Sequence, residues 1–254
     1  MKFKFKIQQY QTDAVENTVA VFRGQPSHTL SNYRIDLGTY KQQRITYEEE
    51  ERGYANHHLE LDKPTILRNI RSVQNLYDIA PSETLAKGVA PVNLDIEMET
   101  GTGKTYVYIK TMFELNKQYG WSKFIVVVPS IAIREGVAKS FQMLEEHFME
   151  YYGKKARWFV YDSHNLQLLD SFSSDSGLNV MIINTQAFAA SMKEGGRSKD
   201  SRIIYSKRDE FGSRRPIDVI AANNPIIIMD EPQKMEGTAT QSGIKRFRNA
   251  QNQA

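Results

Sequence analysis

From residue 92 onward, apolar residues occur either in short strand-like runs or at helical spacing. Short runs bounded by polar or turn residues are typical of buried strands, whereas apolar residues three and four positions apart indicate amphipathic helices. The runs cover residues 92–98, 123–128, 157–161, 180–184 and 225–229, and the helical spacing covers residues 104–118 and 132–151. This alternation predicts an α/β fold with a mostly parallel central sheet flanked by helices.

The chain before residue 92 has a less regular pattern. Residues 1–7 alternate lysine with apolar residues, which predicts a strand, and residues 11–22 have the spacing of a helix. Residues 27–91 mix a strand-like segment at 33–37 with a predicted helix at 64–77, and we interpret them as an insertion or subdomain. Residues 193–223 are rich in Gly, Ser, Arg and Lys, which predicts a surface loop.

Composition excludes several classes of protein. The chain has 254 residues, of which 40% are hydrophobic and 25% charged, as in an ordinary soluble domain. It has no cysteine, which excludes disulfides, thiolate zinc sites and cysteine nucleophiles. Its apolar runs are far shorter than the ~20 residues of a membrane span, and its start lacks the apolar core of a secretory signal. We therefore expect a cytoplasmic protein without a membrane partner.

Charge adds little to this picture. The formal net charge is +3, so bulk electrostatics do not by themselves indicate a nucleic-acid-binding protein. Local basic clusters such as Arg214 and Arg215 are typical of solvated surface faces.

The sequence Met98-Glu-Thr-Gly-Thr-Gly-Lys-Thr105 resembles a phosphate-binding loop. Glycines let the backbone curl so that several N–H groups converge on one anion, and the following helix adds its dipole. Lys104 would then reach the β and γ phosphates of ATP, and the Thr105 hydroxyl would coordinate Mg²⁺. Met98 replaces the first glycine of the general pattern, and a turn without a ligand is the alternative. The residues predicted to bind nucleotide here are Thr100, Gly101, Thr102, Gly103, Lys104 and Thr105.

Two adjacent acidic residues follow the apolar run at 225–229. Asp230 would hold Mg²⁺, and Glu231 would act as the base or position the water that attacks the γ phosphate. Taken alone, the pair could equally cap a loop. A phosphate loop followed by an acidic pair after a buried strand indicates an ATPase more strongly than either motif does alone. The combination predicts Lys104, Asp230 and Glu231 as catalytic residues.

The segment Asp230-Glu-Pro-Gln233 resembles the DExx box of superfamily 2 helicases. Further segments resemble the restriction subunit of type III restriction-modification enzymes, at residues 10–26, 98–105, 125–136, 182–188 and 229–237. The resemblance implies one RecA-like P-loop domain over residues 1–254 that uses ATP and Mg²⁺ and acts on double-stranded DNA. It also implies that Gln11 reads the adenine edge, although a polar residue near a helix start is the alternative.

The same resemblance implies contacts with the nucleic-acid backbone. Pro129, Ser130 and Arg134 lie in the segment that resembles helicase motif Ia, and hydroxyl and basic groups suit phosphate contacts. Thr185 and its neighbours would form a second contact. The alternatives are that Ser130 caps a helix, that Arg134 is an ordinary surface residue, and that residues 184–186 close a strand.

The resemblance further implies a larger enzyme, with a second RecA-like domain, a nuclease domain and a partner methyltransferase subunit that recognises the target. We find no motif of either further domain in this sequence, so we expect an N-terminal fragment that hydrolyses ATP slowly and does not cut DNA. Two alternatives stay open: the motor domain of another DNA or RNA helicase, and a catalytically silent nucleotide-binding module.

Overall fold

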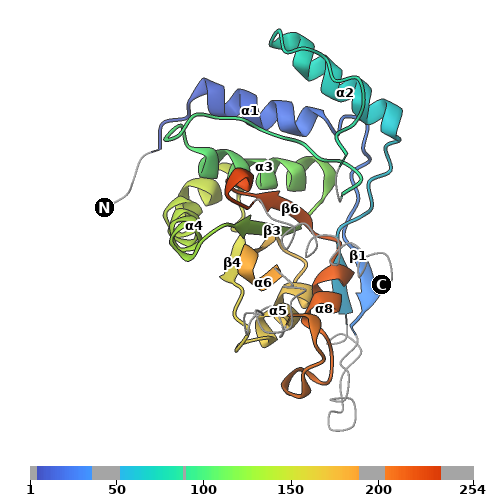
Figure 1. The fold of residues 1–254 in the computed structure, drawn as a ribbon, viewed down its shortest axis with the longest axis vertical. Helices are drawn as coiled ribbons and strands as arrows, with labels where there is room; N and C mark the ends of the chain where they lie inside the picture. Colours follow the sequence, from blue (N-terminus) through green and yellow to red (C-terminus); the bar gives the residue numbers. More distant parts are fainter. Residues whose placement is uncertain (1–4, 36–51, 88–89, 189–203, 236–254) are drawn as a thin grey trace. The chain divides into compact units, whose positions relative to one another are not determined.

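The computed structural model describes residues 5–35, 52–87, 90–188 and 204–235 (Figure 1). The chain divides into two compact units. The helical unit comprises Met1–Thr29, His58–Trp121 and Ser140–Lys155. The sheet unit comprises Leu30–His57, Ser122–Lys139 and Ala156–Ala254. No helix among the described residues combines the length and apolar character needed to cross a membrane.

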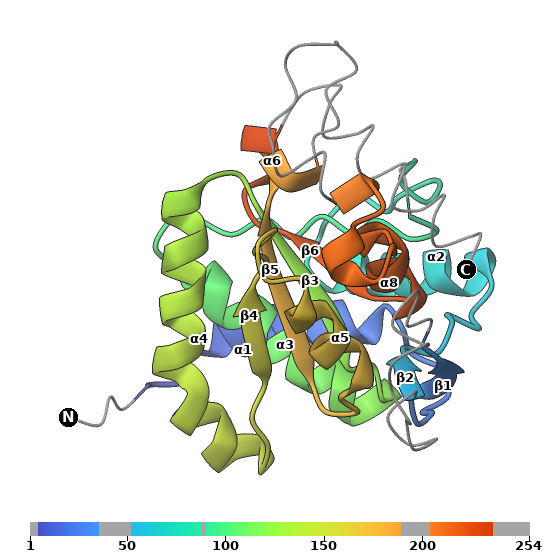
Figure 2. The same ribbon diagram turned by 90° about the horizontal axis from the view of Figure 1, so that it is seen from below.

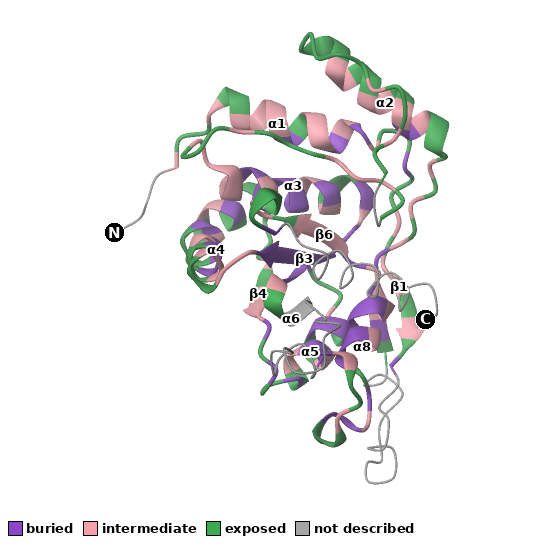
Figure 3. Ribbon diagram, in the orientation of Figure 1, coloured by how far each residue is buried: buried purple, intermediate pink, exposed green. Residues whose placement is uncertain are grey.

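The sheet unit is built on parallel strands. The strands are β3 (Lys123–Val128), β4 (Arg157–Val160), β5 (Asn179–Asn184) and β6 (Ile226–Met229), in the order β4-β5-β3-β6. All six residues of β3 are buried, as expected for a Val- and Ile-rich central strand of a parallel sheet (Figure 3). The predicted parallel α/β architecture is confirmed, with strands at four of the five predicted runs.

The core of the sheet unit lies between the strands and helices α5 (Gln167–Ser174) and α8 (Pro216–Ala222) (Figure 2). Alternate residues of β3 and β5 point into this core, because side chains alternate across a strand. The strands contribute Ile125, Val127, Met181 and Ile183, and the helices contribute Leu169, Phe172, Ile217 and Ile220.

The prediction of a surface loop at 193–223 is wrong for its described part. Residues 189–203 lie outside the described residues, but 204–223 contain the 3-10 helix η3 (Asp209–Phe211) and α8. Ile204 and Phe211 are 0% and 1% exposed. The segment is polar on average, but its few apolar residues, such as Ile204 and Phe211, pack together in the core of the sheet unit. Arg214 is also buried rather than solvated: it stacks on the Phe211 ring and forms a bidentate pair with Asp170 at 2.8 and 2.9 Å.

Part of the predicted insertion belongs to the sheet unit. Strands β1 (Ser31–Arg34) and β2 (Arg52–Ala55) pair antiparallel, so the predicted strand at 33–37 begins earlier, and residues 36–51 lie outside the described residues. Asn56 follows β2 and is 2% exposed. Its Oδ1 accepts the N–H groups of Ser122 at 2.7 Å and Lys123 at 2.9 Å, and its Nδ2 donates to the Lys123 carbonyl at 2.8 Å. Asn56 thereby attaches the insertion to the start of β3.

The four predicted helices are observed, with bounds close to those expected. They are α1 (Gln9–Ala20), α2 (Lys63–Leu76), α3 (Lys104–Tyr119) and α4 (Ile131–Tyr152), whose residues 140–152 belong to the helical unit. Local capping explains the bounds of α2, because the Asp62 carboxylate accepts the Thr65 N–H at 2.9 Å. Gly103 and Gly120 cap the two ends of α3 in left-handed conformations.

Aromatic and backbone contacts hold the helical unit together. Phe113 of α3 stacks with Phe148 and Tyr152 of α4 at ring-centroid distances of 4.8 and 4.9 Å. The Tyr119 hydroxyl donates to the Val19 carbonyl of α1 at 3.1 Å.

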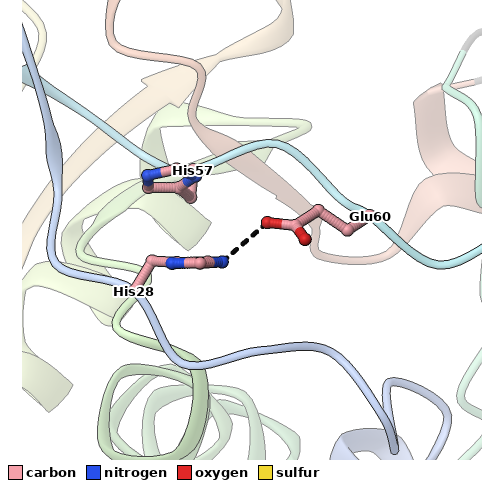
Figure 4. Close-up of side chains that lie close together, drawn as sticks. All are labelled: His28, His57 and Glu60. Atoms are coloured by element: carbon pink, nitrogen blue, oxygen red, sulfur yellow. Dashed lines mark ion pairs between the residues drawn. The ribbon is translucent and has the colours of Figure 1, made fainter.

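The end of α3 crosses a neighbouring segment closely. Gly120 has φ +79°, and a Cβ atom there would lie 1.8 Å from the backbone carbonyl oxygen of His28. Only glycine therefore fits at position 120, beside the His28 carbonyl. The His28 ring in turn pairs with the Glu60 carboxylate at 2.6 Å, as Figure 4 shows.

Two predicted strands are not observed. The structure has no strand at residues 92–98, and Ile96 is 48% exposed. Residues 5–7 also form no strand, and residues 1–4 lie outside the described residues. Both segments alternate apolar and charged residues, but alternation defines two faces without providing the neighbouring strand that a ladder requires.

Candidate functional site

The predicted phosphate loop forms a tight turn before α3 in the helical unit. The Thr102 N–H and hydroxyl both donate to the Glu99 carbonyl, at 3.4 and 2.6 Å. Gly103 follows with φ +90°, which L-residues other than glycine adopt at a cost, and its carbonyl accepts the Val107 N–H at 3.0 Å. The chain therefore enters the helix directly from a left-handed glycine, as a loop that presents its amides to an anion requires.

Lys104 and Thr105 are the first two residues of α3, and both are half-buried. The Lys104 ammonium donates to the carbonyls of Met98 at 3.0 Å and Glu99 at 3.4 Å. The lysine thus folds back over its own loop, where an anion bound to the loop amides would also meet its charge.

Gln11 contacts this loop from α1. Its Nε2 donates to the Thr102 carbonyl at 2.8 Å, and the hydroxyl of Tyr10 donates to the same carbonyl at 3.1 Å. A Cβ atom at Gly103 would lie 2.5 Å from Gln11 Nε2, so the glycine also permits this close approach. The structure therefore brings Gln11 together with Thr102 and Gly103, residues 91 and 92 positions further along the chain. Its role toward adenine stays a prediction.

In the sheet unit, the predicted acidic residues follow β6. The Asp230 N–H donates to the Val127 carbonyl of β3 at 2.9 Å, which extends the ladder beyond Met229. Asp230 is half-buried. The central strand therefore fixes the backbone of this aspartate, and its role toward a metal ion stays a prediction.

Glu231 has a backbone conformation rare for its type. Its φ is +53°, in the left-handed region, and its carboxylate forms an ion pair with Lys234 on the 3-10 helix η4 (Pro232–Met235). Left-handed conformations of non-glycine residues cost roughly 1 kcal/mol and are common at functional sites. Lys234 was not identified from the sequence, although its position three residues after Glu231 was a usable indication.

The predicted nucleic-acid contacts lie at the same edge of this sheet. Val128 pairs with Asn184 and Val127 with Met229, so β5, β3 and β6 end together. The segments that follow their carboxyl ends contain Pro129 and Ser130, Thr185, and Asp230. Ligands of parallel α/β sheets bind at this edge.

Some contacts in these segments agree with the alternatives to DNA binding, namely a helix cap at Ser130 and an ordinary surface role for Arg134. The Ser130 hydroxyl accepts the Ile133 N–H at 3.3 Å and so caps α4. The Arg134 guanidinium pairs with the neighbouring Glu135 at 2.9 Å. Thr185 is the first residue of the short helix α6 (Thr185–Phe188). A helix cap and a phosphate contact are compatible, because the capping residue lies at the end where the helix attracts anions.

Comparison with known proteins agrees with these motifs. The family model "Type III restriction enzyme, res subunit" matches residues 4–252. The chain is 33% identical over 210 residues to the EcoP15I Res subunit of Escherichia coli, covering 78% of this chain and 21% of that protein. It is 30% identical over 255 residues to the EcoPI Res subunit of Escherichia phage P1, covering 95% of this chain and 24% of that protein.

A third relative is the StyLTI Res subunit of Salmonella typhimurium, 33% identical over 162 residues, which cover 56% of this chain and 16% of that protein. The chain thus spans about a quarter or less of the length of these relatives. The match of the family model over nearly the whole chain, together with the parallel α/β sheet, agrees with a RecA-like domain. The chain belongs to the family of type III restriction enzyme res subunits.

Proposed function

We propose that this chain is the ATP-binding and ATP-hydrolysing motor domain of a type III restriction subunit, acting on double-stranded DNA. The observation that supports this most is the phosphate loop. Gly103 is left-handed at the start of α3, and Thr102 beside it is held by α1. A turn built this way directs backbone N–H groups and a helix N-terminus toward one point, which suits a polyphosphate.

Each residue would have a separate task toward the nucleotide. Lys104 would bind the β and γ phosphates, Thr105 and Asp230 would hold Mg²⁺, and Glu231 would take the proton of the attacking water. When bound, the metal ion would neutralise charge on the phosphate oxygens. Thr100, Gly101 and Gly103 would contribute backbone amides, and Thr102 closes the turn through its hydrogen bonds to the Glu99 carbonyl.

Nucleotide titration tests this assignment. We would titrate a fluorescent ATP analogue with Mg²⁺ into the chain and into Lys104→Ala, Glu231→Gln and the control Lys117→Ala, an exposed lysine on the same helix. We expect Lys104→Ala to lose binding and Lys117→Ala to retain it. Glu231→Gln should bind normally and release no phosphate. Equal binding by Lys104→Ala and the unaltered chain would refute the phosphate-loop assignment.

We further propose that Pro129, Ser130, Arg134 and Thr185 contact the DNA backbone. Support comes from their place at the carboxyl edge of the sheet, where backbone amides and a hydroxyl begin α4. Phosphate contacts position a protein without reading sequence. DNA binding by Arg134→Ala should weaken equally for unrelated sequences and show a salt slope smaller by about one. An unchanged slope would remove Arg134 from the contact.

The activity of the whole enzyme is also a proposal. We propose that a partner methyltransferase subunit selects the DNA target, that a nuclease region outside this chain cuts, and that the protein acts in the cytoplasm. An arginine supplied across the nucleotide can accelerate phosphate transfer by about 10³ to 10⁵. Phosphate release by this chain alone should therefore be slow, and DNA cleavage by the purified chain would contradict the proposal.

A further inference from the structure

The Thr102 carbonyl in the phosphate loop accepts two hydrogen bonds from consecutive residues of α1. Gln11 Nε2 donates at 2.8 Å and the Tyr10 hydroxyl at 3.1 Å. The two donors lie 91 and 92 residues earlier in the chain, so the contact is a tertiary one. Two side chains directed at one backbone oxygen fix the orientation of that peptide group.

The orientation of this peptide group determines where the Gly103 amide points. The Thr102 carbonyl and the Gly103 N–H belong to one planar trans peptide, in which the two groups point in opposite directions. Because α1 holds the carbonyl on its own side, the Gly103 N–H is directed away from α1. Gly103 has φ +90° and caps α3, so its amide lies where the helix N-terminus attracts an anion.

From this geometry we propose that Tyr10 is a positioning residue of the phosphate loop, acting with Gln11 through the Thr102 carbonyl to aim the Gly103 amide at the phosphates. The proposal rests on the proposed ATP-binding function. It assigns Gln11 a task toward the phosphates besides any contact with adenine. Tyr10 and Gln11 would therefore affect binding of the polyphosphate, whichever base the nucleotide carries.

Base-free tripolyphosphate separates this role from recognition of adenine. We would measure the binding of Mg²⁺-tripolyphosphate and of Mg²⁺-ATP by competition against a fluorescent ATP analogue. Tyr10→Phe removes the hydroxyl and keeps the ring. The matched control is Tyr77→Phe, because Tyr77 belongs to the same unit and, like Tyr10, is 49% exposed.

We expect Tyr10→Phe to weaken tripolyphosphate and ATP by the same factor, about three- to tenfold, as for the loss of one hydrogen bond. Gln11→Glu, which places a carboxylate against the Thr102 carbonyl, should weaken both ligands further. Tyr77→Phe should match the unaltered chain. Melting temperatures of Tyr10→Phe and the unaltered chain should agree within about 2 °C, since the hydroxyl bond is at the surface.

Two outcomes would overturn the proposal alone. In the first, Tyr10→Phe binds tripolyphosphate as tightly as the unaltered chain while Lys104→Ala loses it. In the second, Tyr10→Phe binds both ligands normally while Tyr10→Ala loses ATP and keeps tripolyphosphate, which would make the ring a stacking platform for the base. Failure of the unaltered chain to bind either ligand would instead overturn the proposed function and this proposal together.

Discussion

Replacing Asn56 by alanine should destabilise the sheet unit more than any surface substitution. The side chain is 2% exposed and makes three hydrogen bonds to Ser122 and Lys123, all shorter than 3.0 Å. Alanine removes the partner of two backbone N–H groups and one carbonyl at the start of the central strand. Because Asn56 attaches the end of β2 to the start of β3, the loss affects both elements.

The magnitude follows from the hydrogen bonds. Each contributes about 1 kcal/mol net, which gives about 3 kcal/mol, and more if no water enters the space to satisfy the freed groups. Total stabilities are about 5–15 kcal/mol, so this is a large fraction. For a chain of this length it corresponds to a fall in melting temperature of roughly 6–12 °C.

Thermal and urea unfolding of Asn56→Ala would measure the effect. The control is Asn32→Ala, an exposed asparagine on β1 of the same insertion, which should stay within about 0.5 kcal/mol of the unaltered chain. If Asn56→Ala were equally stable, the three contacts would not hold the insertion on β3, and the reasoning from buried polar groups would be refuted.

Three further predictions concern the sheet unit. Arg214→Met should cost about 2–4 kcal/mol in urea unfolding, because it leaves the half-buried Asp170 without its bidentate partner, whereas the double change with Asp170→Asn should cost less than the sum of the single changes. Burial lowers the pKa of Lys123 from 10.5 to about 7, so between pH 7 and 10 the unfolded chain binds more protons than the folded chain. Unfolding free energy should therefore rise with pH, by up to about 1.4 kcal/mol per unit, and Lys123→Met should abolish the rise. Glu231→Gly should be about 1 kcal/mol more stable than Glu231→Ala, because only glycine relieves the left-handed backbone, while both variants should lack ATPase activity; equal stabilities would contradict the strain.

Local signals explain what the sequence could predict. Helix α3 was located well because its apolar residues recur at helical spacing, which is a local property of the sequence. Strands β3 and β5 were located because a buried parallel strand is a continuous apolar run. The phosphate loop and the acidic pair were recognisable because their chemistry requires specific residues at short spacing.

Tertiary contacts explain what the sequence could not predict. Asn56 is an ordinary polar residue until the fold places it beside Lys123, 67 positions away. Arg214 was assigned to the surface because clustered basic residues are usually solvated, and its partner Asp170 lies 44 positions earlier. The role of Tyr10 depends on a carbonyl 92 positions later. In each case the decisive partner is distant in sequence, and neither composition nor periodicity contains that information.

Gly103 and Gly120 stand at the two ends of α3, and a side chain at each would displace a different kind of neighbour. Substitutions at the two positions should therefore impair different properties of the protein. At Gly103 an added Cβ meets the end of the flexible Gln11 side chain at 2.5 Å. At Gly120 it meets the backbone of His28 at 1.8 Å. In a mutational scan that measures protein abundance and nucleotide binding separately, substitutions of Gly103 should mainly lower nucleotide binding. Substitutions of Gly120 should mainly lower protein abundance.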